Sequence, residues 1–174
     1  LLNVTEDLEV IIHLAPDDWS PAAAMAPVSK WRTVGVNERS WTTRLNTSGT
    51  LGLFWSTDGT NATVLSRTST TNLAAMANDA PLWLRFRLDV DNGAAGCDVK
   101  FYTSPDGVTW TQLGATVTQA GVTSIFNSTA GLAVGARDNG TIERLVGRVF
   151  SAEIRNGIDG TIVANPDFGE QLAG

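Results

Sequence analysis

The sequence predicts an all-β fold, because apolar side chains recur at every second position along much of its 174 residues. The clearest such segment runs from Leu82 to Val90, where leucine, phenylalanine and valine alternate with tryptophan, arginine and aspartate. Turns that contain glycine, such as Asp91–Gly93 and Pro105–Gly107, separate the alternating segments. Many short strands at this spacing indicate an antiparallel two-sheet sandwich or barrel of about ten to fourteen strands.

Six further segments are predicted to be strands on the same criteria: residues 8–14, 40–45, 50–55, 99–102, 131–135 and 147–154. Only residues 21–26 and 72–79 gather helix-favouring alanine and methionine, and each is too short for more than a turn or two of helix. With 43% hydrophobic residues, 17% charged residues and no internal linker, the chain fits one domain that spans residues 1–174.

The charged and reactive residues exclude several classes of function. The formal charge is 12 − 18 = −6, and the arginines and lysines are scattered, so no basic run is available to neutralise nucleic-acid phosphates. The longest apolar stretch falls far short of the roughly 20 residues that cross a bilayer, so neither nucleic acid nor a membrane is an expected partner. Cys97 and His13 are each the only residue of their type, which excludes a disulfide framework and a His/Cys metal site.

Two sets of motifs resemble a known family. The first half contains the motifs Asp18-Trp19-Ser20-Pro21, Val28-Ser29-Lys30-Trp31, Arg39-Ser40-Trp41 and Gly49-Thr50-Leu51-Gly52-Leu53-Phe54-Trp55-Ser56. The second half contains the segments 83–93, 101–110, 132–135 and 147–154. Together they resemble laminin-G-like, concanavalin A-like jelly-roll domains, of the variety found in tailed-phage minor tail proteins and actinobacterial surface proteins. The resemblance covers nearly the whole chain and implies a two-sheet antiparallel jelly-roll sandwich in a phage tail or at a cell surface.

Residues 104–110 resemble a second motif, the Asp-box of sialidases and related β-propellers. In that motif one residue separates the aspartate from the glycine, whereas Asp106 and Gly107 are adjacent, so a propeller is not expected. The residues still predict a hairpin turn, in which the aspartate caps backbone N–H groups, the glycine takes a positive φ and Trp110 covers the turn. The segment therefore indicates a hairpin rather than a catalytic centre.

The family resemblance also bears on catalysis. Enzymatic relatives of this jelly roll, the laminarinase-type glucanases, place three carboxylates on one strand in the pattern Glu-x-Asp-x-x-Glu. A retaining glycosidase needs its acid and its nucleophile about 5–5.5 Å apart. Because that pattern is absent from the sequence, the chain is expected not to be an enzyme, and carboxylates that converge from different strands remain the alternative.

The outward face of the predicted strand 82–90 carries the leading candidates for binding. They are Trp83, Arg85, Arg87 and Asp89, residue types that are common at interfaces and in sugar stacking. A hairpin with the next strand is expected to form the pairs Asp89–Lys100, Arg87–Tyr102 and Arg85–Ser104. Three interpretations of this face are open. Its charges and rings form a self-satisfied ladder, in which they pair only with one another; or they form a ligand site that includes Tyr102; or a loop or a neighbouring subunit covers them.

The six tryptophans divide into two groups. Those in strand-like segments are expected in the core: Trp41, Trp55 and Trp110. Those near predicted loops or on the outward face are candidates to stack on a sugar ring or to anchor a protein partner: Trp19, Trp31 and Trp83.

The sequence requires no cofactor, and structural calcium is the one ion that the resemblance implies, because jelly rolls of this kind often bind it. Asp17, Asp18 and Asp159 offer the oxygen ligands that calcium prefers, as does the segment 89–92. Acidic turn residues also cap backbone amides, and this alternative stays open.

Three functions are compatible with these observations. The first is a non-catalytic adhesion module of a phage tail, a phage fibre or a bacterial surface protein, which binds a glycan or another surface partner by stacking and hydrogen bonding. The second is a structural module that packs against other virion proteins, with the Trp/Arg face as an assembly interface. A glycoside hydrolase is the third.

Overall fold

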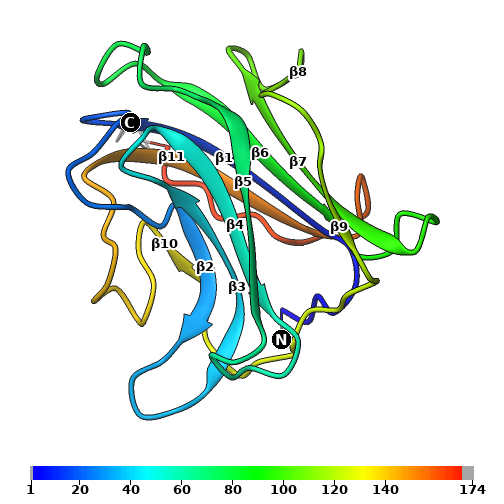
Figure 1. The fold of residues 1–174 in the computed structure, drawn as a ribbon. Coiled ribbons are helices and arrows are strands. Elements are labelled where there is room, and N and C mark those ends of the chain that lie inside the picture. The colour runs from blue at the N-terminus through cyan, green and yellow to red at the C-terminus, as the bar shows by residue number, and fades with distance from the viewer. Residues whose placement is uncertain (1, 170–174) are drawn as a thin grey trace.

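The computed structural model describes residues 2–169, which form two antiparallel β-sheets in two layers (Figure 1). Within these residues the seven-stranded sheet has the order β12-β11-β1-β6-β7-β8, and β9 pairs with another part of β7. Its strands are β1 (Leu8–Pro16), β6 (Leu82–Asp89), β7 (Gly96–Ser104), β8 (Thr111–Gln112), β9 (Val117–Ala120), β11 (Gly147–Asn156) and β12 (Thr161–Ala164). The five-stranded sheet has the order β10-β2-β3-β4-β5, with β2 (Val28–Arg32), β3 (Glu38–Leu45), β4 (Thr50–Ser56), β5 (Val64–Asn72) and β10 (Ala133–Val134).

The predicted all-β class and the two-sheet antiparallel architecture are confirmed. Residues 21–26 and 73–79 form bends, turns and irregular segments with one isolated bridge at Met25, and Asn72 ends β5. Residues 2–169 contain no helix that is long and apolar enough to cross a membrane. The sequence does not predict β5, because its residues are mostly polar and only Ser69 among them is fully buried. The outer limits of the predicted single domain, at residues 1 and 174, lie outside the described residues.

The core lies between the two sheets and is built from the inward residues of their strands. On β6, Leu84, Phe86 and Leu88 are fully buried, and the residues between them are half-buried on the outer face. Trp41 and Trp55 pair across β3 and β4 and are both fully buried, as the sequence predicts. Burying one leucine or phenylalanine side chain contributes about 1.5–3 kcal/mol, so this alternation fixes which face of each strand points outward.

The structure corrects the expectation that Trp19 and Trp31 are accessible. Trp19 lies in the loop from β1 to β2, which crosses from one sheet to the other, and its side chain belongs to the core with an exposed fraction of 0%. Trp31 lies on β2 and is 5% exposed. Gly49 has a φ of 77° and lies so close that a Cβ there would be 2.9 Å from the carbonyl oxygen of Trp19. A position near a loop therefore does not free either indole to stack on an external ligand.

The β6–β7 hairpin keeps the predicted faces but shifts the predicted pairing by two residues. The observed partners are Asp89–Asp98, Arg87–Lys100, Arg85–Tyr102 and Trp83–Ser104. The connecting loop is more compact than expected, because Asn92 accepts a hydrogen bond from the N–H of Gly96 and donates one to Asp98. A shift of two residues leaves every side chain on its original face of the sheet.

The loop between β7 and β8 forms the predicted hairpin turn. The Asp106 carboxylate accepts hydrogen bonds from the N–H groups of Thr109 and Val108 and from the hydroxyl of Ser104, each at 2.8 Å. These bonds favour the ionised carboxylate and lower the pKa of Asp106 from 3.8 to about 2. Gly107 has a φ of 74°, and a Cβ there would be 2.9 Å from the indole of Trp83. The turn is therefore fixed against the outer face of the seven-stranded sheet.

Replacing Trp19 with alanine is expected to lower the free energy of unfolding by about 3–5 kcal/mol, the usual effect of removing a buried tryptophan. Denaturant unfolding measures this change. Val108, which is 80% exposed, supplies the control, because Val108→Ala should change stability by less than about 0.5 kcal/mol. Equally small effects of the two substitutions would contradict the burial of Trp19.

The pKa of Asp106 predicts a pH dependence of stability. Because the folded pKa is depressed to about 2, ionised Asp106 contributes stability that is present above its unfolded pKa, about 3.9, and is lost as the pH falls through about 2. The amide that replaces this carboxylate in the variant Asp106→Asn does not titrate, so the stability difference between the two proteins should shrink between about pH 5 and about pH 2. Urea unfolding across this range measures it, and a constant difference would argue against the hydrogen-bonded carboxylate.

Candidate functional site

The outer face of the seven-stranded sheet carries the predicted binding residues. Trp83, Arg85, Arg87 and Asp89 are half-buried there and alternate with fully buried residues of β6. On one side, β1 supplies their neighbours: Glu9 beside Arg87, Ile11 beside Arg85 and His13 beside Trp83. On the other side, β7 supplies Lys100 and Tyr102. Both arginines therefore lie outside the core, in a row of aromatic and charged side chains.

Arg87 is fully engaged with groups of its own protein. Its Nε donates to Glu9 at 2.5 Å, and its terminal nitrogen donates to Asp159 at 2.5 Å. Glu9 is 0% exposed, so an ion pair is needed to keep its charge stable at this position. The guanidinium also lies 5.5 Å from the centre of the Tyr102 ring. Arg87 and Asp159 therefore form part of the ladder of paired charges that was one interpretation of this face.

Neighbouring groups of the protein cover the ring of Trp83, so the ring is not open to a ligand. Its indole stacks on the His13 imidazole with ring centres 4.4 Å apart and planes within 3°. The turn at Gly107 approaches the same indole. Burial lowers the pKa of His13, which favours the neutral imidazole in this stack. Phe150 contacts the imidazole at a ring-centre distance of 4.5 Å.

Unlike Arg87, Arg85 takes part in no ion pair among the described residues of this face, and Lys100 of β7 does not either. Its guanidinium lies 4.0 Å from the centre of the Trp110 ring, close enough for a cation–π interaction. None of the ion pairs within residues 2–169 includes Arg85, and its buried Nε has no hydrogen-bond partner there. Burial lowers the pKa of Arg85, because partial removal from water disfavours the cation.

A hollow of about 350 Å³ opens beside Arg85. Its lining consists of Ile11, Trp83, Arg85, Gly107, Ser151, Glu153, Arg155 and Asn165. Glu153 and Arg155 pair with each other at 2.6 Å. Arg85 is the lining cation that forms no direct ion pair within residues 2–169, and the charges of Glu9 and Asp159 act on it from a greater distance. The hollow combines a free guanidinium with hydroxyl and amide groups that can bond to a polar ligand.

The remaining predicted residues of this face lie around a second, much smaller hollow. Asp89, Tyr102 and Arg87 line a space of about 50 Å³ together with Asp98, Lys100 and Ile158. Burial and the neighbouring charge of Asp7 raise the pKa of Asp89. Trp83 and Arg85 therefore both line the larger hollow, whereas Asp89 and Tyr102 line the smaller one, although Tyr102 is the cross-strand partner of Arg85.

The carboxylates beside the larger hollow do not form an accessible catalytic pair. Two of them approach the Nε of Arg155: Glu153 at 2.6 Å and Glu9 at 3.7 Å. Glu9 is fully buried, and its other contacts are with Arg87 and with the N–H of Asp159, so it is not accessible to a ligand. A glycosidase requires two carboxyl groups that both reach the sugar, and this pair instead balances the charges of arginines.

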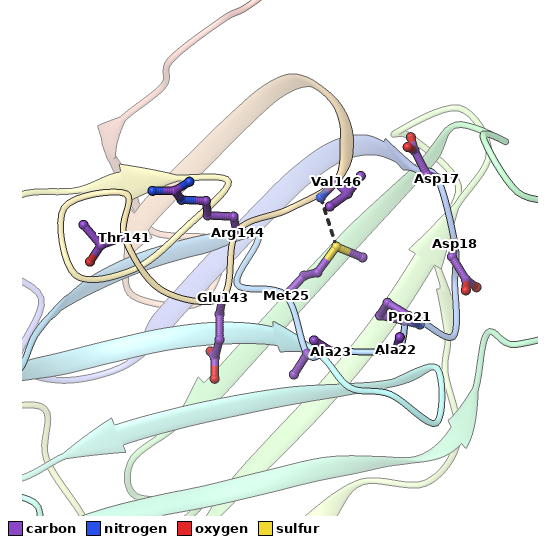
Figure 2. A pocket seen from close by; sticks show the side chains of 11 residues that line it. Asp17, Asp18, Pro21, Ala22, Ala23, Met25, Thr141, Glu143, Arg144 and Val146 are labelled. Atoms are coloured by element: carbon purple, nitrogen blue, oxygen red, sulfur yellow. Dashed lines mark hydrogen bonds between the residues drawn. The ribbon is translucent and has the colours of Figure 1, made fainter.

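The residues predicted to hold calcium do not form one site. Asp17 and Asp18 line a groove near the β1–β2 loop (Figure 2), where Asp18 accepts hydrogen bonds from the N–H and hydroxyl of Ser20. Asp159 lies at the turn after β11 and pairs with Arg87. Because β1 and β11 pair antiparallel along their length, Asp17 and Asp159 lie at opposite ends of the sheet. No group of three or more His, Cys, Asp or Glu within residues 2–169 could hold a metal ion, so calcium stays a prediction of the resemblance alone.

Most residues around the hollow are not among those that the sequence identifies as binding candidates. They are the lining residues Ile11, Gly107, Ser151, Glu153, Arg155 and Asn165, together with His13 beneath Trp83 and Trp110 beside Arg85. The segment that contains His13 is apolar at nearly every position, so its outward face cannot be recognised from alternation. Trp110 is expected in the core but is half-buried beside Arg85. The sequence feature that could have placed Trp110 near the site is its position just after the Asp106–Gly107 turn, because this turn folds back onto β6.

No family model and no curated protein matches this chain. Solved structures do match it. The CBM40 domain of the Ruminococcus gnavus IT-sialidase, bound to α2,3-sialyllactose, matches with 13% identity and a TM-score of 0.61, over 89% of this chain and 78% of that chain. The same domain bound to α2,6-sialyllactose matches with 14% identity and a TM-score of 0.54, over 84% and 74%.

A heptameric SAP-like pentraxin from Limulus polyphemus matches with 13% identity and a TM-score of 0.50, over 88% of this chain and 65% of the pentraxin chain. Identities this low relate folds rather than functions. Together with the strand order, the matches confirm that the chain is an all-β, two-sheet antiparallel jelly roll of the concanavalin A-like class. Its membership of a phage tail or of an actinobacterial surface protein stays a prediction.

Proposed function

We propose that this domain is a non-catalytic module that binds a glycan in the hollow beside Arg85. The observation that carries the proposal is the arginine itself, whose guanidinium lies 4.0 Å from the Trp110 ring centre without an anionic partner among residues 2–169. The likeness to a CBM40 domain in complex with sialyllactose supports a glycan as the ligand. Because a fold alone does not select a ligand, the chemistry of the hollow has to indicate which glycan it binds.

A glycan that carries a carboxylate fits this chemistry. A guanidinium donates two parallel hydrogen bonds to a carboxylate, and stacking on Trp110 holds its plane in place before the ligand arrives. Ser151 and Asn165 line the same hollow and offer groups that bond to sugar hydroxyls. The volume of about 350 Å³ lies at the small end of ligand sites, which suits one sugar residue. Binding of this kind involves no covalent step.

The module would serve as an attachment element of a larger protein, in a phage tail or fibre or on a bacterial surface. The motif resemblance supports this location. A single shallow site binds weakly, and display of several copies on one particle raises the overall affinity without any new contact. Attachment to a surface glycan therefore requires neither a deep pocket nor a catalytic group.

Arg85→Gln is expected to weaken binding of α2,3-sialyllactose by about 10–100-fold, because a hydrogen bond to a charged group contributes about 1.5–3 kcal/mol. Isothermal titration calorimetry measures the affinity. Arg148→Gln is the matched control, because Arg148 is an exposed arginine of β11 that does not line the hollow. This control should bind as the wild-type protein does.

Lactose lacks the carboxylate, so a comparison of lactose with sialyllactose tests carboxylate recognition separately from glycan binding. If the wild-type protein binds lactose and sialyllactose with equal affinity, and Arg85→Gln leaves both affinities unchanged, Arg85 does not bind a carboxylate. A glycan array on which the wild-type protein retains no ligand would overturn glycan binding altogether.

A structural assembly module is the second candidate, and β12 is the feature that favours it. This edge strand exposes Ile162 (46%) and Val163 (38%), and an exposed apolar edge is suited to pairing with a strand of another chain. If β12 pairs between copies, light scattering should show an oligomer for the wild-type protein and a monomer for Ile162→Lys. A wild-type monomer that also fails to bind virion proteins would count against this candidate.

A further inference from the structure

We propose a second binding site, in the groove between residues 17–25 and 141–146, for an aliphatic ammonium compound with an apolar body and a cationic head (Figure 2). The groove has a volume of about 680 Å³ and lies where the loop from β1 to β2 meets the segment before β11. It shares no lining residue with the hollow beside Arg85. The two sites are therefore separate, and this inference does not rest on the proposed glycan binding.

The groove is already formed, because hydrogen bonds join its two walls. The N–H of Asp17 donates to the carbonyl of Val146 at 3.0 Å, and the N–H of Ala26 donates to the carbonyl of Glu143 at 2.8 Å. The N–H of Val146 contacts the Met25 sulfur at 3.1 Å, as the dashed line in Figure 2 shows. A ligand that enters does not have to order the walls, which favours binding of a small molecule.

The surface between the walls is apolar and built from small side chains. Pro21, Met25 and three consecutive alanines form most of one wall, and Val146 lies on the other. Ala22 and Ala23 are exposed, and Val146 is 59% exposed. Short side chains leave room for an aliphatic chain, whose removal from water drives its binding.

One end of the groove is negatively charged. Asp17 and Asp18 both line this end, where Figure 2 shows their carboxylates pointing in different directions. Neither takes part in an ion pair within residues 2–169. One oxygen of Asp18 accepts from Ser20, and the other oxygen remains available. A cationic head placed here can pair with one of these carboxylates and is also attracted by the charge of the other, since neither has a counterion among the described residues.

The other charged residues of the groove do not change this preference. Glu143 pairs with Arg44 and Arg137, so its charge is balanced. Arg144 donates from its Nε to the carbonyl of Gly140 at 2.7 Å, and Figure 2 shows its side chain on the far side of the groove from Asp17. The negative end therefore keeps its attraction for a cation.

An organic cation fits this groove better than a bare metal ion does. Calcium takes six to eight oxygen ligands, whereas the acidic end offers two consecutive aspartates and the rest of the lining is mainly apolar. An alkyl chain covers the alanines and Met25, and its ammonium group reaches the carboxylates. The recognition combines burial of an apolar body with one charge pair.

Hexylammonium is the probe, and NMR titration of the full chain at low salt is the measurement. We expect hexylammonium to shift the amide signals of residues 21–25 and 144–146 and to bind about three- to fivefold more tightly than hexanol, the gain that an exposed charge pair supplies. Hexanoate should bind more weakly than hexanol. The double substitution Asp17→Asn with Asp18→Asn should bring hexylammonium to the affinity of hexanol, and the amide oxygen introduced by Asp18→Asn retains the acceptor for Ser20.

Two controls make the result decisive. Asp91→Asn removes one negative charge from the exposed loop after β6 and should leave hexylammonium binding unchanged. Ala23→Trp fills the groove from an exposed position and should abolish binding of both probes. Equal affinities for hexylammonium and hexanol, shifts produced by calcium chloride instead, or no shifts with any probe would each overturn the proposal.

Discussion

Burial of the inner face of the seven-stranded sheet determines where every charge on its outer face lies. Leu84, Phe86 and Leu88 are fully buried between the sheets, and successive side chains of a strand point to opposite faces. Arg85 and Arg87 therefore point outward, because a register that turned them inward would place guanidinium groups in the core and leucines in water. The cost of burying an unpaired charge makes that alternative inaccessible.

The outer face then balances most of its own charges. Glu9 is fully buried and is held by Arg87 and Arg155, as a buried carboxylate requires. Trp83 stacks on His13. Arg87 and Trp83, two of the residues that the sequence favours as ligand contacts, therefore make their main contacts within the sheet itself. The ladder of paired charges and the ligand site, which were alternative interpretations of the sequence, thus apply to different parts of one face. The ladder covers Arg87 and its partners, and the proposed ligand site is centred on Arg85.

Periodicity predicts the fold well where one side of a strand is buried and the other is not, as in β6. The same criterion misses β5, whose side chains are largely polar on both faces, and it cannot orient His13 within an apolar segment. The partners of a side chain depend on register, which the sequence predicts only approximately, because hydrogen bonds of Asn92 tighten the β6–β7 loop. The shift leaves each side chain on its predicted face but changes its neighbour, so Arg85 lies beside Tyr102 instead of Ser104 and Arg87 lies beside Lys100 instead of Tyr102.

The loop between β7 and β8 contributes to the proposed site, and packing of the core does not constrain its exposed residues. Trp110 reaches Arg85 from this loop, while Asp106 and Gly107 set its shape. Positions 108 and 109, between Gly107 and Trp110, are exposed to solvent. Because Asp106 binds the backbone N–H groups of these two positions, substitutions there would alter the surface next to Trp110 while the turn and the sandwich stay intact. In the proposed glycan site, this is the place where contacts beyond the hollow could vary without a change of scaffold.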